Sequence, residues 1–339
     1  MANNLSNTEI HLKIDEIEDF KFPQDKDFKL KVTHNNIEYD FIIKLSRRNK
    51  NLIAFGSGAF SRDRTTSSGK LIKPPYLHRW SWYKYFDESF IAYADPMFYL
   101  DDELTLGWYV GEKDWYLEII SIIIKKICIN QNIADENILF FGSSGGGFSS
   151  IGLACLIKDS KALVNISSFS VKDISQNHYD NLMNVLKREL NLSEEEIIEK
   201  INHRLDIIEL FKYEHYVPPI SYYINYNSKL DLNDRCMPFL NKILELDEFN
   251  NDLSIHFYHD SDETSGGHVP MSNKETINII KLYSRNNLYN GENKPPVVDS
   301  EKKLRKKIIQ LKNVNAEMEN SLSWKITKPL RKLKSMFKS

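Results

Sequence analysis

The sequence predicts an α/β protein built on a mainly parallel sheet with helices on both faces. Short apolar runs that end at glycine or Asp-Pro alternate with longer segments of helical apolar spacing. Such alternation is typical of parallel strands joined by helical crossovers. The chain has 339 residues, 41% hydrophobic and 27% charged, which is enough for one large folded core and excludes a disordered chain.

The predicted elements follow in order along the chain. Residues 28–45 alternate apolar and polar side chains around Asn35-Asn36, which predicts an N-terminal β-hairpin. Further strands are predicted at 51–55, 90–94, 137–141, 162–166, 220–226 and 253–258, and helices at 115–129, 148–157, 237–246 and 274–283. Residues 171–216 break the alternation with charged helical segments, which suit either a cap over the strand ends or a solvated insertion.

The chain divides into four predicted parts. Residues 1–50 form a β extension of the α/β core at 51–285, and residues 286–300 are an Asn- and Pro-rich linker. Beyond the linker, residues 301–339 form a helical tail with 12 Lys/Arg and 3 Glu, about +9, so the remainder carries about −11 of the net charge of −2. A basic end on an acidic body indicates an anionic partner for the tail alone.

The tail has two predicted segments. Residues 301–322 carry apolar side chains at three- and four-residue spacing, which predicts a short coiled coil for self-association. Residues 323–339 hold six Lys/Arg and no acid, which favours a basic amphipathic helix on an anionic membrane surface, with a solvated or partner-binding tail as the alternative. Because the positive charge is confined to this tail, no nucleic-acid partner is expected.

Targeting and metal signals are weak throughout the sequence. The polar N-terminus predicts no signal peptide, and no run of apolar residues is long enough for a membrane span. The three cysteines lie far apart, which predicts reduced thiols and no metal-ligand pair. We therefore expect a cytoplasmic protein, with its tail at the inner face of the cell membrane, and neither a metal nor a cofactor.

The strongest motif is the glycine-rich turn FGSSGGG at 141–147. Gly142, Ser144 and Gly146 form G-x-S-x-G between a predicted strand and a predicted helix, the setting that exposes a serine nucleophile on a sharp turn. Residues two positions either side of the serine must lack a side chain to avoid collision. Ser144 then stands at a helix N-terminus, where the N–H of Gly145 can stabilise an oxyanion.

Other interpretations of this turn are weaker. Ser143 is the alternative nucleophile, but Phe141 would then occupy a position that should be glycine. A phosphate-cradling loop is disfavoured, because neither Gly-Lys-Ser/Thr nor the order G-x-G-x-x-G is present. A glycine turn without chemistry stays open.

A serine hydroxyl needs a base, and histidine is the usual one. His268 fits best, since it follows the last predicted strand in a loop that Gly266 and Gly267 allow to bend back. His259, at the end of that strand, is the alternative.

The acid that orients the base is expected after the strand at 220–226, in the order serine, acid, histidine. The predicted loop at 227–235 offers Asp231 and Asp234. Asp231 comes sooner after the strand and is preferred, while Asp234 suits the cap of a helix starting near Cys236.

The second oxyanion donor is expected in the loop after an earlier strand. Ser57 and Gly58 follow the strand at 51–55, and an ordinary glycine turn is the alternative there. Beyond this loop, candidates to contact an anionic or sugar substrate are Arg62, Arg64, Arg79 and Trp80, of which we favour Arg79 and Trp80.

These residues carry a family resemblance. The core from Asn51 to Ser284 resembles the α/β-hydrolase superfamily in its elbow and in the order Ser144, Asp231, His268. The segment DPMFYLDDELTLGWY at 95–109 resembles a block in α/β-hydrolase-like proteins of bacterial surface-polysaccharide loci. Residues 321–331, SLSWKITKPLR, are similar to a C-terminal element of bacterial glycosyltransferases and methyltransferases that build capsule or O-antigen.

The elbow and the tail together lead to two hypotheses of function. The first is a serine esterase or O-acyltransferase that acts on a glycan or glycan precursor in surface-polysaccharide biosynthesis. The second is a non-catalytic scaffold of the same fold that recruits glycan-assembly enzymes to the membrane. Labelling of the serine by an active-site probe distinguishes them.

Overall fold

The computed structural model describes residues 8–66, 68–247, 249, 252–262 and 264–285. The predicted linker at 286–300 and the predicted tail at 301–339 lie outside these residues. The coiled coil and the membrane-binding helix therefore stay predictions.

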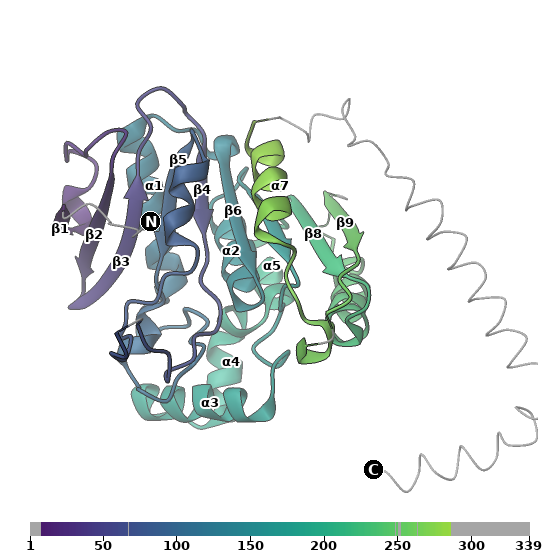
Figure 1. Cartoon of the computed structure of the whole chain (residues 1–339). Helices are drawn as coiled ribbons and strands as arrows, with labels where there is room; N and C mark the ends of the chain where they lie inside the picture. Colours follow the sequence, from purple (N-terminus) through teal and green to yellow (C-terminus); the bar gives the residue numbers. More distant parts are fainter. Residues whose placement is uncertain (1–7, 67, 248, 250–251, 263, 286–339) are drawn as a thin grey trace, which may run out of the picture. The chain divides into compact units, whose positions relative to one another are not determined.

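The described chain is organised around one mixed sheet, with strand order β1-β2-β3-β5-β4-β6-β7-β8-β9 (Figure 1). β3 pairs antiparallel with both β2 and β5, and the other neighbouring strands pair in parallel. The strands are β1 Glu9–Lys13, β2 Asp27–His34, β3 Ile37–Lys44, β4 Leu52–Phe55, β5 Ser89–Tyr93, β6 Ile138–Ser143, β7 Lys161–Asn165, β8 Ile220–Asn225 and β9 Leu253–Tyr258. This confirms the mainly parallel sheet and the hairpin around Asn35-Asn36.

Helices cover both faces of the sheet, as predicted. Figure 1 shows α1, α2 and α5 on one face and α7 on the other. The helices are α1 Tyr116–Gln131, α2 Gly145–Leu156, α3 Gln176–Leu190, α4 Glu194–Leu205, α5 Ile207–Glu214, α6 Met237–Ile243 and α7 Asn273–Arg285. Because the central strands are sandwiched between helices, every residue of β4, β5 and β6 is buried.

Two elements differ from the sequence-based expectations. The short parallel strand β1 was not predicted, because its alternating polar side chains are those of an edge strand that buries only Leu12. The predicted loop at 227–235 is instead largely helical, since Leu230–Cys236 forms a π-helix that continues into α6. This helix places Asp231 and Arg235, four residues apart, on one side.

The predicted insertion at 171–216 forms α3, α4 and α5. Figure 1 shows α3 and α4 beyond the ends of the strands rather than on a face of the sheet. Two arginines attach them to the loop between β5 and α1. Arg188 of α3 pairs with Asp101 at 2.8 Å and donates to the Leu100 carbonyl, and Arg204 of α4 donates to the Val110 and Glu112 carbonyls. The insertion is thereby joined to the core by directed polar contacts.

Within the described ranges, no helix combines the length and the apolar character needed to cross a bilayer. The three cysteines, Cys128, Cys155 and Cys236, are buried and form no disulfide. Burial raises the pKa of the Cys128 and Cys236 thiols to about 12, so both stay protonated at neutral pH.

We expect His203 on α4 to make the fold less stable in mild acid. Its ring stacks on the ring of Tyr213 with the centroids 4.1 Å apart, and burial lowers the pKa of His203 from 6.5 to about 4. Between these two values the unfolded chain binds a proton that the native protein does not, so the free energy of unfolding decreases as the pH falls through this window. Discounted for partial exposure, the effect at pH 5 is on the order of 1 kcal/mol.

Urea unfolding at pH 7.5 and pH 5 measures this effect. The His203→Phe variant keeps an aromatic ring but cannot titrate, so it should lose less stability than the unmodified protein over the same pH change. An identical loss in both proteins would contradict the assignment.

Candidate active site

The turn at 142–146 joins β6 to α2 and holds Ser144 in a strained backbone conformation, with φ 54° and ψ −127°. A Cβ on Gly142 would lie 1.9 Å from the Gly146 carbonyl oxygen, and a Cβ on Gly146 would lie 2.6 Å from that of Gly56. Any side chain at either position would collide with backbone. The sequence-based argument that glycine is required on both sides of Ser144 is thus confirmed.

The structure brings together Ser144, His268 and Asp231, which come from three separate segments. His268 Nε2 lies 3.2 Å from Ser144 Oγ, and His268 Nδ1 lies 2.7 Å and 2.9 Å from the two oxygens of Asp231. A carboxylate only accepts, so the proton of the neutral ring is assigned to Nδ1. Nε2 is then an acceptor that faces the serine hydroxyl, the arrangement that removes a proton from a nucleophile.

The Asp231 carboxylate has a second partner that the sequence did not reveal. Arg235 Nη1 donates to Asp231 Oδ1 at 2.9 Å, with Asp231 fully buried and the Arg235 side chain 5% exposed. Arg235 Nε and Nη2 both donate to the Asp173 carbonyl, in the loop between β7 and α3. Arg235 Nη1 and His268 Nδ1, 3.2 Å apart, are both donors that converge on one carboxylate. The Arg235 guanidinium therefore holds the Asp231 carboxylate in place and links it to the loop that precedes α3.

The predicted oxyanion donors meet different partners. The Ser57 N–H donates to the Tyr109 hydroxyl at 3.0 Å, so the expectation that it faces a substrate is not met. The Gly58 N–H makes only a long bond, 3.3 Å, to Nδ1 of His78. A Cβ on Gly58 would lie 3.7 Å from the nitrogen of Gly145, which places Gly58 against the start of α2. Gly58 and Gly145 are thus the neighbouring backbone groups at the elbow.

The segment at 95–109 holds the loop after β4 in place through hydrogen bonds. The buried Asp95 carboxylate accepts from the N–H groups of Met97 and Tyr109. The Tyr109 hydroxyl accepts from the Ser57 N–H and donates to the Ser57 carbonyl at 3.2 Å. This segment, for which the sequence suggested only a resemblance, therefore holds the loop after β4 in place.

The alternative residues lie elsewhere. Asp234 is exposed on the π-helix, and the exposed His259 stacks on Tyr226 with ring centroids 5.0 Å apart. Ser143 Oγ accepts a hydrogen bond from Arg79 Nη2 at 3.2 Å. Of each competing pair, only the preferred residue is within reach of the others.

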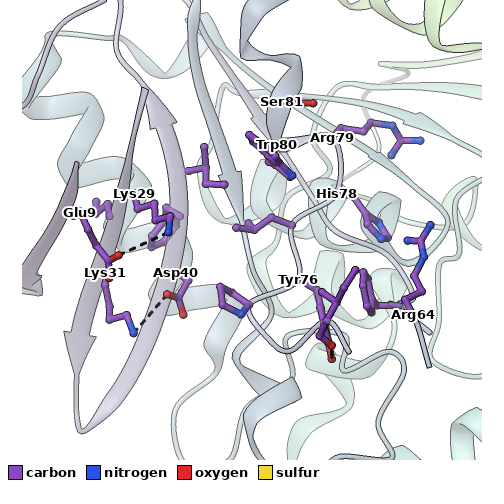
Figure 2. Close-up of a pocket in the computed structure, with 17 residues that line it drawn as sticks. Glu9, Lys29, Lys31, Asp40, Arg64, Tyr76, His78, Arg79, Trp80 and Ser81 are labelled. Atoms are coloured by element: carbon purple, nitrogen blue, oxygen red, sulfur yellow. Dashed lines mark hydrogen bonds and ion pairs between the residues drawn. The ribbon is translucent and has the colours of Figure 1, made fainter. Parts of the chain in front are cut away.

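Arg79 and Trp80 line a cavity of about 600 Å³ between β2, β3 and residues 75–81 (Figure 2). Figure 2 shows the side chains of Arg64, His78 and Arg79 on one side of this cavity and the Lys31–Asp40 ion pair on the other side. Burial, together with the charges of Arg79 and Arg64, lowers the pKa of His78 to about 4. His78 is therefore neutral at pH 7, and because Nδ1 accepts from Gly58, its proton is assigned to Nε2.

Comparison with solved structures finds the same architecture in a capsule O-acetyltransferase of Neisseria meningitidis serogroup A. The match has a TM-score of 0.55 at 14% identity and covers 75% of this chain and 96% of that one. A mutant of the same acetyltransferase in complex with CoA matches with a TM-score of 0.56 at 14% identity, covering 75% and 94% of the two chains. No protein-family model matches the sequence, and no curated protein matches it.

The chain has the α/β-hydrolase fold. Ser144 directly follows β6, Asp231 lies after β8, and His268 lies after β9. β1 pairs in parallel with β2 at one edge of the sheet.

Two residues of the site were missed in the sequence. Arg235 could have been found from its i,i+4 spacing to Asp231, but only if this segment had been recognised as helical. His78 lies 20 residues from Gly58, and no spacing pattern in the sequence predicts their contact. Among the described residues, no group of three or more metal-ligating side chains occurs.

Proposed function

We propose that this protein is a serine esterase or O-acyltransferase that acts on a glycan or a glycan precursor in surface-polysaccharide biosynthesis. The single observation that carries the proposal is the continuous contact Ser144–His268–Asp231, at 3.2 Å and 2.7 Å, on a strained elbow. An ordinary surface serine has no positive φ, and it does not contact a histidine that is itself hydrogen-bonded to a buried carboxylate.

The proposed reaction has two steps, acylation and deacylation of Ser144. Ser144 Oγ attacks the ester or thioester carbonyl while its proton passes to His268 Nε2. The tetrahedral oxyanion collapses, and the leaving group departs with that proton, which forms an acyl-enzyme. Water or a glycan hydroxyl then attacks the acyl carbon, gives its proton to His268 Nε2, and releases Ser144 as the leaving group, which recovers a proton from the same nitrogen.

The oxyanion is stabilised by the N–H groups of Gly145 and Gly58. Gly145 is the first residue of α2, where the helix dipole adds favourable potential. The long bond from Gly58 to the neutral His78 ring is weaker than a bond to an anion, so the oxyanion replaces it.

The glycan and acyl-transfer parts of the proposal have separate support. The fold is shared with a capsule O-acetyltransferase, one structure of which holds CoA. The resemblance of 95–109 and of 321–331 to proteins of polysaccharide loci indicates the same pathway. We therefore favour a sugar hydroxyl as the acceptor and an acyl thioester of the CoA type as the donor.

A fluorophosphonate probe tests the catalytic part directly. The probe should label one residue, Ser144, and labelling should be prevented by denaturation. Peptide mapping by mass spectrometry locates the adduct, and pre-incubation with an acyl donor should slow its formation. If the folded protein remains unlabelled, the non-catalytic scaffold becomes the better account.

A further inference from the structure

Arg79 is held in an unusual backbone conformation beside the elbow. It has φ 54° and ψ 16°, the left-handed region that a residue with a Cβ rarely adopts, at the residue before the 3-10 helix Trp80–Tyr85. Its guanidinium lies over the rings of Trp82, at 5.3 Å, and Phe141, at 5.6 Å. The conformation therefore directs the side chain to the end of β6, where Ser143 and Ser144 lie.

The guanidinium has few protein partners for its five N–H donors. Among the residues that the structure describes, it makes one hydrogen bond, from Nη2 to Ser143 Oγ at 3.2 Å, and no ion pair. Burial lowers the pKa of Arg79 to about 10, and the group is still a cation at neutral pH. Arg79 is half-buried, and a cation withdrawn from water without a carboxylate is unfavourable. The buried Arg235, in contrast, pairs with Asp231.

The surroundings of Arg79 are positive as well. Arg64 is a second cation near His78, and both arginines contribute to keeping that imidazole neutral. Arg64 lies over the Phe60 ring, and no carboxylate in the described part of the chain pairs with it. The segment between β4 and the 3-10 helix therefore carries two cations that no described carboxylate pairs with, and one of them donates to Ser143, the neighbour of Ser144. Both arginines line the cavity of about 600 Å³, which is large enough for a sugar and whose lining includes Glu9 and Asp40 but not Ser144.

We propose that Arg79 binds an anionic group of the substrate, a phosphate or a carboxylate, next to Ser144. The inference rests on the proposed function and specifies its substrate class: one of the two molecules that meet at Ser144 carries a negative charge. A planar guanidinium with free N–H pairs binds such a group in bidentate fashion. The charge belongs either to the phosphates of the acyl donor or to an anionic sugar of the acceptor.

Binding is measured by calorimetry on the Ser144→Ala variant, in which turnover is blocked, so the result does not depend on whether the enzyme reaction occurs. Three pairs of probes separate the sources: CoA with pantetheine, N-acetylglucosamine 1-phosphate with N-acetylglucosamine, and glucuronate with glucose. In each pair only the first member carries the negative charge. We expect one anionic probe to bind at least tenfold more tightly than its neutral counterpart, and the pair concerned identifies the source.

Arg79→Met in the same background should weaken that anionic probe at least tenfold and leave the neutral one unaffected, and Arg79→Lys should lie between. The control is Arg47→Met, which removes an equal charge from an exposed arginine 4.0 Å from Asp25. If Arg79→Met does not fold, crystals of the Ser144→Ala protein soaked in tungstate should show the anion within hydrogen-bonding distance of the guanidinium. Equal binding in Arg79→Met and Arg47→Met, the absence of binding by every anionic probe, or no tungstate at Arg79 would overturn the proposal.

Discussion

Replacing Ser144 with alanine is expected to lower kcat for ester cleavage by a factor on the order of 10⁵ to 10⁶. The hydroxyl is the only group that forms the acyl-enzyme in the proposed reaction, and what remains is stabilisation of the oxyanion by backbone N–H groups. Release of p-nitrophenol from p-nitrophenyl acetate measures the rate. The fold should be unaffected, since Ser144 owes its conformation to the glycines around it.

The competing residues provide matched controls for this result. Ser143→Ala, His259→Ala and Asp234→Asn change the neighbouring residue of the same type in each pair, and all three should still form the acyl-enzyme. His268→Ala and Asp231→Asn should not form it at a measurable rate. A Ser144→Ala protein as active as the unmodified one would remove the catalytic proposal altogether.

Replacing Arg235 with methionine is expected to reduce both stability and turnover. Asp231 is fully buried, and without the guanidinium its carboxylate keeps the His268 ring as a hydrogen-bond donor but loses its cationic partner. Breaking a buried pair costs about 3 kcal/mol of folding free energy. The freed carboxylate also lets His268 shift, and a displacement of about 1 Å lowers kcat by roughly a hundredfold.

Arg204→Met is the control that separates the two effects. Arg204 is a half-buried arginine on α4, and it donates to the Val110 and Glu112 carbonyls rather than to a residue of the triad. Both variants should unfold at lower urea concentrations, but only Arg235→Met should lower kcat while KM for a small ester stays nearly constant. Arg235→Lys should recover part of kcat. An equal fall of kcat in Arg204→Met would mean that Arg235 acts through general stability alone.

Most of the fold could be predicted from the sequence, because buried parallel strands and their covering helices have distinct apolar patterns. The strand β6, entirely apolar until its glycine, and the helix α1, with isoleucines at helical spacing, are recognisable one segment at a time. The strand β1 and the π-helix at Leu230–Cys236 could not be predicted in this way. Their polar residues become ordered through tertiary partners, β2 in one case and Asp173 in the other.

The elbow could be identified from the sequence alone, because the collision that demands glycine at Gly142 involves Gly146, only four residues away. The collision at Gly146 involves the Gly56 carbonyl in the loop after β4, a contact that only the tertiary structure shows. The order serine, acid, histidine was expected from the fold that the sequence resembles. Ser144, Asp231 and His268 follow that order, after β6, β8 and β9. That Asp231 and not Asp234 meets His268 is visible only in the tertiary structure, as is the difference between Arg235, which pairs with the Asp231 carboxylate, and Arg79, which pairs with no carboxylate among the described residues. These contacts join residues up to 124 positions apart, and short-range sequence patterns carry no information about which side chains meet across such a distance.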